Sequence, residues 1–238
     1  MALSDRPFRR FVITASICFA ATSWFSAAFV LFLRDVMLLS EQYIMVLMSA
    51  GSAGVLLTIR YWQRFADFSG SGRAMGKTLM AYSLISLAFL AFDPEDSWAR
   101  YALWPAVILS TAFGAAFWMA AHRAMLNYTN KSHRICYTNL WILGTSVTLG
   151  ATPILAGAFI HWWGLWGFRI CFLISGIAGL ICAGASVWFV EDGNRPIKRS
   201  LSALMDPAIP LRTLARIAWI TLGRHESNRS ASIPGNDK

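Results

Sequence analysis

Six apolar stretches dominate the chain and decide the solvent in which it can fold. They cover residues 11–33, 43–59, 76–92, 101–121, 138–160 and 170–190. None contains Asp, Glu, Arg or His, and Lys77 is their only Lys. Each is about 17 to 23 residues long, and a helix that rises about 1.5 Å per residue needs about 20 residues to cross the hydrocarbon core of a bilayer. The sequence therefore predicts an all-α membrane protein with six transmembrane helices.

The composition agrees with residence in a lipid bilayer. Hydrophobic residues make up 56% of the chain and charged residues 14%, whereas soluble domains contain about 25% charged residues. The net charge of +9 would suggest a nucleic-acid partner in a soluble protein, but here the basic residues lie mostly in segments that flank the apolar stretches. We expect an integral membrane protein, in a bacterial cytoplasmic membrane, with no nucleic-acid partner.

The basic residues lie on alternate connections and predict the orientation. One side holds Arg6, Arg9, Arg10, Arg60, Arg64, Arg73, Lys77, Arg123, Lys131 and Arg134, and the other holds Arg34, Arg100 and Arg169. Because short cytoplasmic segments are enriched in Lys and Arg, both termini are predicted to be cytoplasmic. This divides the chain into an N-terminal segment (1–10), a membrane domain (11–190) and a cytoplasmic tail (191–238). In the tail, residues 211–222 suit a helix in the headgroup layer.

The chain shows none of the patterns that carry catalysis or metal binding. Its four cysteines, Cys18, Cys136, Cys171 and Cys182, lack metal-binding spacing. Neither a phosphate loop nor a pair of carboxylates is visible. We therefore predict that the protein is not an enzyme and needs no metal or other cofactor.

Polar residues recur on one face of two apolar stretches and are candidates to line a cavity. Cys18, Thr22 and Ser26 share a face of the first stretch, and Thr145, Thr148 and Thr152 share a face of the fifth. The alternative is structural, because threonine hydroxyls can donate to carbonyl groups of their own helix.

Glycine and proline mark bends and close packing. Gly150, Pro153 and Gly157 predict a bend in the fifth stretch, since proline removes a helix hydrogen bond. Small residues at 175, 179 and 183, and the pair Gly51 and Gly54, predict close approach of neighbouring helices.

The connection after the second stretch carries the most specific motif. It contains Asp67, Gly70 and Arg73 and resembles the loop motif of the major facilitator superfamily, Gly-x-x-x-Asp-Arg-x-Gly-Arg-Arg/Lys. Asp67 and Gly70 match the family's Asp and second Gly, whereas Gln63 and Phe68 depart from the motif. The resemblance implies that this loop latches one conformation, with Asp67 pairing with a neighbouring helix end.

The order of features in the last four stretches is similar to one six-helix half of a facilitator. A Gly-Ala-rich end of the fourth stretch is followed by Gly150 to Gly157 and then by the turn Gly167-Phe168-Arg169. The fourth stretch lacks the membrane-embedded Arg of many N-terminal halves, so residues 10–190 look most like a C-terminal half. The resemblance implies that the first and fifth helices face a central cavity.

Two functions remain open at this point. The first is a half-sized transporter that moves a small solute with a second six-helix half or as a homodimer, since the inner face needs cover. The second is an accessory subunit that binds other membrane protein subunits and transports nothing. Apart from Lys77 at the edge of the third stretch, the stretches carry no charge, which argues against ion-coupled transport.

Overall fold

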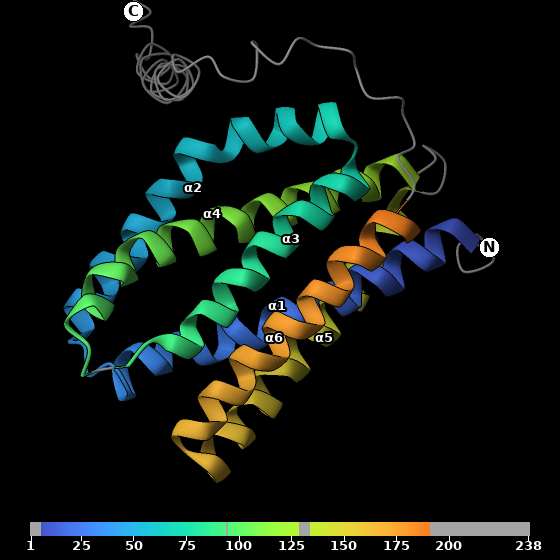
Figure 1. The fold of residues 1–238 in the computed structure, drawn as a ribbon. Coiled ribbons are helices and arrows are strands. Elements are labelled where there is room, and N and C mark those ends of the chain that lie inside the picture. The colour runs from blue at the N-terminus through green and yellow to red at the C-terminus, as the bar shows by residue number, and fades with distance from the viewer. Residues whose placement is uncertain (1–5, 94, 129–133, 191–238) are drawn as a thin grey trace, which may run out of the picture. The chain divides into compact units, whose positions relative to one another are not determined.

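The computed structural model describes residues 6–93, 95–128 and 134–190, and these contain six long helices. The helices are α1 (Arg6–Asp35), α2 (Glu41–Ser69), α3 (Ser71–Ala88), α4 (Ser97–Tyr128), α5 (Arg134–Trp163) and α6 (Leu165–Phe189), with a 3₁₀ turn η2 (Phe89–Ala91) after α3 (Figure 1). All six are long and apolar enough to cross a membrane, which confirms the predicted transmembrane helices. The tail and its predicted headgroup-layer helix lie outside the described residues.

Several helices are longer than the apolar stretches from which they were predicted. α2 continues ten residues beyond Ile59, so most of the predicted loop between the second and third stretches is helical. Hydropathy detects the part of a helix that lies in hydrocarbon, whereas backbone hydrogen bonding continues into the basic and aromatic segment that follows. The helix ends where Gly70 adopts φ +87° and ψ 152°, a conformation that is essentially confined to glycine.

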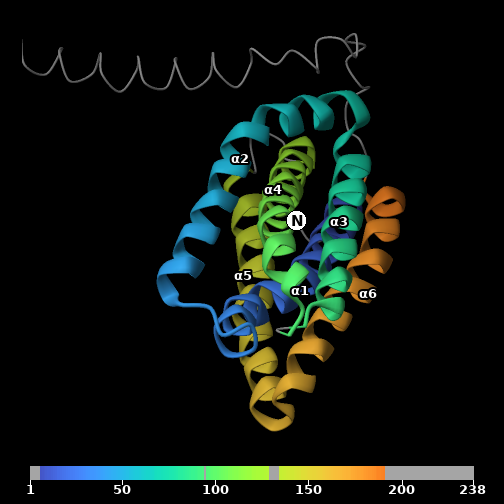
Figure 2. The same cartoon turned by 60° about the vertical axis from the view of Figure 1, so that its left-hand side comes forward.

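The six helices form two intertwined sets of three. α1 packs on α5 and α6, and α4 packs in the same way on α2 and α3, while α3 and α6 pack on each other. Exchanging α1, α2 and α3 with α4, α5 and α6 leaves this pattern of major contacts unchanged. Figure 2 shows α1 and α4 among the other helices. The chain therefore contains a structural repeat of three helices, related to inverted repeats seen in transporters.

The N-terminus of α1, the α2–α3 corner and the end of α6 lie at one end of the bundle. The rings of Phe8 and Tyr137 are 4.2 Å apart between centroids, and a Cβ atom added at Gly72 would lie 2.6 Å from the Val190 carbonyl oxygen. Because Arg9, Arg64 and many of the other cations of the predicted cytoplasmic side belong to these segments, we call this the basic end.

Two aromatic clusters hold the helices together. At the basic end, Phe11 of α1 stacks on Trp141 of α5, with ring centroids 5.3 Å apart. In the second cluster, Phe89 and Phe172 bring the end of α3 and α6 onto Phe25 of α1. In lipid such packing stabilises helix association by van der Waals contact, since lipid tails are as apolar as the side chains.

Small residues allow the closest helix contacts. A Cβ atom added at Gly179 would lie 2.0 Å from Oγ of Ser83, and one added at Gly176 would lie 2.4 Å from the Leu87 side chain. These contacts confirm that small residues of α6 form a packing seam, and they place α3 as its partner.

α2 and α5 are the least covered helices. Within the 18-residue apolar segment of each helix, only 22% is buried in α2 and 17% in α5, against 50% in α1 and in α3. The two helices occupy equivalent places in the three-helix repeat, so the second helix of the repeat is exposed in both copies.

Candidate functional site

A cavity of about 260 Å³ opens between α1 and α4, inside the apolar stretches of both helices. α2 and α3 contribute one residue each. Its lining consists of Thr22, Phe25, Ser26, Phe29, Val30, Met48, Tyr82, Ser110, Thr111, Gly114, Ala115, Phe117 and Trp118. The surface is therefore a mixture of hydroxyl groups and aromatic rings, and it contains no charged side chain.

Hydroxyl groups of α1 and α3 form a small network at one wall of the cavity. Oγ of Ser26 lies 3.2 Å from the hydroxyl oxygen of Tyr82. The Tyr82 hydroxyl also donates to the carbonyl oxygen of Thr22 at 3.4 Å. Tyr82 is 6% exposed, so α3 supplies a buried polar group that holds its ring beside α1.

The hydroxyl groups of α4 bind their own helix. Oγ of Ser110 donates to the Val107 carbonyl oxygen at 3.0 Å, and Oγ1 of Thr111 donates to the same oxygen at 2.7 Å. On the α1 side, Oγ1 of Thr22 donates to the Phe19 carbonyl oxygen at 3.0 Å. Protons of these hydroxyls are thus directed at the backbone, and their lone pairs stay available.

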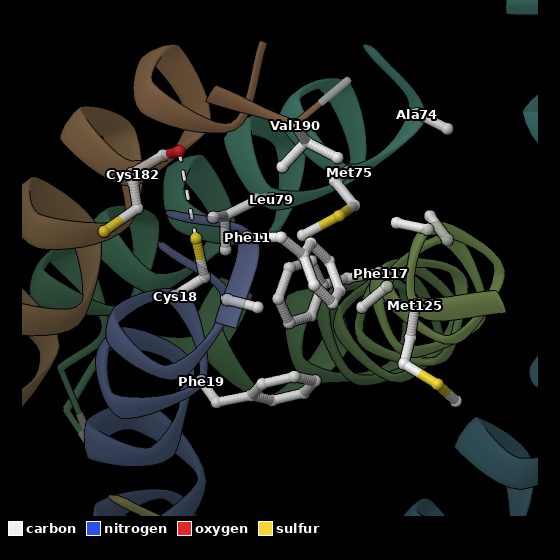
Figure 3. Close-up of a cluster of buried hydrophobic side chains, with 14 of the residues drawn as sticks. Phe11, Cys18, Phe19, Ala74, Met75, Leu79, Phe117, Met125, Cys182 and Val190 are labelled. Carbon is white, nitrogen blue, oxygen red and sulfur yellow. Dashed lines mark hydrogen bonds between the residues drawn. The ribbon is translucent and has the colours of Figure 1, made fainter. Parts of the chain in front are cut away.

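Thr22 and Ser26 line this cavity, whereas Cys18, on the same face one turn earlier, does not border it. Figure 3 shows the Cys18 thiol pointing toward the Cys182 carbonyl oxygen, at a distance of 3.9 Å, among the buried side chains of the basic end. Cys18 thus packs α1 against α6.

The threonines of α5 share a face that packs on α1, away from the cavity. Thr145 donates to the Trp141 carbonyl oxygen at 3.0 Å and Thr152 to that of Thr148 at 2.7 Å. Thr148 in turn donates to the Thr145 carbonyl oxygen at 2.8 Å. These hydroxyl groups therefore donate to carbonyl groups of their own helix, as the alternative to a cavity lining expects. That Thr145, Thr148 and Thr152 line a cavity shared with a second bundle stays a prediction.

Gly150, Pro153 and Gly157 lie on the exposed face of α5. A Cβ atom added at Gly150 or Gly157 would meet no atom within 4 Å. Pro153 is inside the helix, which continues to Trp163. The bundle therefore leaves these three residues uncovered, and a bend at Pro153 stays a prediction.

Asp67, near the end of α2, forms an ion pair with Arg123 near the end of α4. The two side chains are 28% and 42% exposed, respectively, so solvent weakens the pair without removing it. A second hollow of about 570 Å³ lies here at the basic end, bordered by Gln63, Ala66, Asp67, Trp118, Met119, His122, Arg123 and Leu126. Trp118 lines both this hollow and the cavity, so its indole lies between them.

The other two residues of the predicted latch have distinct positions. Gly70 ends α2 and precedes α3 directly, since its N–H donates to the Ala66 carbonyl oxygen while its own carbonyl accepts from the N–H of Ala74. Arg73 is exposed on the first turn of α3. The structure thus brings Asp67 to Arg123 and makes Gly70 the corner, and the latch function stays a prediction.

Tyr82, Ser110, Thr111 and Trp118 were missed by the sequence reasoning. The spacing of Ser110, Gly114 and Trp118 by four residues places them on one helix face, and this pattern was available as a signal. For Tyr82 no pattern pointed to the cavity, because its direction depends on how α3 is rotated against α1.

Among the described residues, no group of three or more His, Cys, Asp or Glu side chains is arranged to hold a metal ion. Comparison with known proteins gives one match. The family model described as Major Facilitator Superfamily matches residues 11–224. Searches of curated proteins and of solved structures return no match. The matched range contains α2 to α6 and α1 from Phe11 onward, and the resemblance of the loop around Asp67 points the same way, so the chain belongs to the major facilitator superfamily.

Proposed function

We propose that this six-helix bundle is one half of a solute transporter and that a second six-helix bundle completes it. The observation that carries the proposal is the cavity between α1 and α4, which lies within the apolar stretches and is open on one side. Ligand pockets usually measure about 300 to 1,000 Å³. The volume of about 260 Å³ lies just below this range, as expected if this bundle forms only one side of a larger, shared cavity.

The exposed faces of α2 and α5 are the surfaces that the second bundle covers. Leu56 of α2 is 59% exposed and Ile154 of α5 is 75% exposed. Lipid could solvate these side chains, but lipid tails would then compete with a solute for the open side of a cavity that carries five hydroxyl groups. A second bundle, in the same polypeptide, in a second copy or in another chain, keeps that side accessible to a solute.

In this proposal the ion pair between Asp67 and Arg123 keeps the cavity closed at the basic end. Their ion pair joins α2 to α4 beside Trp118, which separates the hollow at the basic end from the cavity. Breaking the pair would let α2 move away from α4 and open a path past the Trp118 indole. A partly exposed ion pair suits this role because it is weak enough to open.

A second candidate is an accessory subunit that binds other membrane proteins through the same exposed faces. The exposed apolar side chains of α2 and α5 fit this function equally well. The hydroxyl-lined cavity favours transport, because the hydroxyl groups of Thr22, Ser110 and Thr111 bind their own helices and join no two helices together.

Photo-crosslinking tests what covers α2 and α5. p-Benzoylphenylalanine replaces Leu56 or Ile154 in the full chain, and the membranes are irradiated. The matched control is Ile181 of α6, which is 69% exposed but lies on another helix. Peptide mass spectrometry should identify adducts with a second facilitator-type bundle from positions 56 and 154 and not from position 181.

Two results would contradict the proposal. Adducts with lipid alone at all three positions would show that no bundle covers these faces. Adducts at positions 56 and 154 with a membrane protein of another fold would support the accessory-subunit function instead.

A further inference from the structure

We propose that the cavity between α1 and α4 selects apolar solutes that carry a hydrogen-bond donor, an alcohol or an amine, and rejects anions. The inference rests on the proposed function, because it names the solute class of the same cavity. It follows from the direction of the hydroxyl protons, from the aromatic lining and from the charge of the lining.

The cavity offers acceptors in preference to donors. A hydroxyl group has one proton and two lone pairs. The protons of Thr22, Ser110 and Thr111 are committed to backbone carbonyl oxygens. Those of Ser26 and Tyr82 are committed to the Thr22 carbonyl oxygen or to each other. A solute that accepts a hydrogen bond must first break one of these bonds, whereas a solute that donates one finds free lone pairs.

The aromatic lining has the same preference. Phe25, Phe29, Phe117 and Trp118 border the cavity, and aromatic faces carry negative electrostatic potential that attracts cations and N–H or O–H groups. Hydroxyl lone pairs and ring faces are therefore both rich in electrons. They favour a neutral or positively charged donor.

An anion finds no compensation in this lining. Lys and Arg are absent from the residues that border the cavity, and the nearest ion pair, Asp67 with Arg123, already neutralises its cation. Burial of a carboxylate without a donor or a cation is strongly unfavourable. The lining therefore distinguishes an amine or an alcohol from an acid of the same size.

A series of naphthalene derivatives with one ring system and different polar groups tests the proposal. The probes are 2-naphthalenemethanol, 2-naphthalenemethylamine, 2-methoxynaphthalene and 2-naphthoate. Equilibrium dialysis measures their binding to the full chain in lipid nanodiscs, and empty nanodiscs correct for partition into lipid. The alcohol and the amine should bind about fivefold more tightly than the methyl ether, the factor for one hydrogen bond of about 1 kcal/mol. The naphthoate should bind no better than it does to empty nanodiscs.

Variants connect the selectivity to this cavity. Tyr82→Phe and Ser26→Ala each remove an acceptor oxygen, and either should lower the affinity for the alcohol while leaving that for the ether unchanged, with the loss reaching about fivefold in the double variant. Ser49→Ala is the matched control, because Ser49 also donates to its own helix, at 2.8 Å from the Met45 carbonyl oxygen, but is exposed on α2. Size-exclusion profiles establish that each variant is folded.

The proposal is overturned if the ether or the naphthoate binds as tightly as the alcohol, if no probe binds above empty nanodiscs, or if Ser49→Ala has the same effect as Ser26→Ala. These outcomes are independent of the photo-crosslinking result. A second bundle can be found on α2 and α5 when the selectivity fails, and the selectivity can hold when no second bundle is found.

Discussion

α2 and α5 occupy equivalent places in the three-helix repeat, yet only α5 carries glycines with open space around them. On α2, a Cβ atom added at Gly51 would lie 2.8 Å from Oγ1 of Thr111, and one added at Gly54 would lie 2.8 Å from Cγ2 of Ile108. On α5, Gly150 and Gly157 have open space around them. The glycines of α2 bring this helix close to α4. On α5, Gly144 does the same against α1, since a Cβ atom added there would lie 2.8 Å from Oγ of Ser16, whereas Gly150 and Gly157 meet no atom of the described bundle.

This difference separates two reasons for a glycine in a membrane helix. Gly51 and Gly54 are explained by packing inside the bundle, because small residues let helix backbones approach. Gly150 and Gly157 cost helix stability without improving any contact described here. Their explanation has to lie outside the bundle, in a partner surface or in the bending of α5 around Pro153.

The strongest test of the contrast exchanges glycine for a large residue on both helices. Gly51→Leu should lower the stability of the bundle by about 3 kcal/mol, because the side chain overpacks the contact with α4. Gly150→Leu, the matched change on α5, should leave stability within about 1 kcal/mol of the parent. Thermal unfolding in detergent, followed by loss of the monodisperse size-exclusion peak, measures both. Equal losses would show that the open face of α5 is covered within this chain.

The corners that follow α2 and α5 offer the next test. Gly70 has φ +87° and Gly164 has φ +53°, and both connect the second and third helices of their repeat. Gly70→Ala and Gly164→Ala should each cost about 2 kcal/mol, because an L side chain is strained in such conformations. Thermal unfolding applies again, with Gly184→Ala as the control, since Gly184 is helical and has open space around it. An unchanged midpoint for Gly70→Ala would mean that the corner adopts another conformation.

A smaller effect is expected from the ion pair at the end of α2. Asp67→Asn should cost about 1 kcal/mol or less, because both side chains are partly exposed. A double-mutant cycle with Arg123→Gln isolates the pair from other losses. Additive single effects would contradict the direct pairing, whereas a coupling energy of a few tenths of a kcal/mol or more supports it.

The smallest effect is a gain. Gly150→Ala should stabilise α5 by about 0.5 kcal/mol, since alanine has the better helix propensity and meets no neighbour. Gly51→Ala is the comparison on α2 and should not stabilise, because its Cβ atom displaces Thr111. A rise in the unfolding midpoint together with slower transport by the complete transporter would show that α5 needs to bend.

The sequence predicts the helices better than it predicts the cavity. Six helices follow from stretches that carry no charge apart from Lys77, since a charge in hydrocarbon is costly whatever its neighbours are. The end of α2 was placed too early, because Arg60 and the residues after it are helical but not apolar. The ends of such helices depend on local signals such as Gly70 and not on hydropathy.

To predict which residues line a cavity, one must know how each helix is rotated about its own axis. A single sequence does not give this rotation. Thr22 and Ser26 border the cavity because the polar face of α1 points to open space. Thr145 and Thr148, three residues apart, also share a helix face, but α5 packs on α1 and borders no part of this cavity. Tyr82 was missed because one buried tyrosine among apolar residues has no periodic signature.

The corner at Gly70 has a mechanical consequence. A single residue separates α2 from α3, and its backbone is hydrogen-bonded into both helices, so the connection has no slack. In the proposed transporter, a rotation of α2 at the basic end would move the first turn of α3, the helix that carries the Tyr82 hydroxyl at the cavity wall. The corner would thus couple a movement at the surface of the bundle to the wall of the cavity.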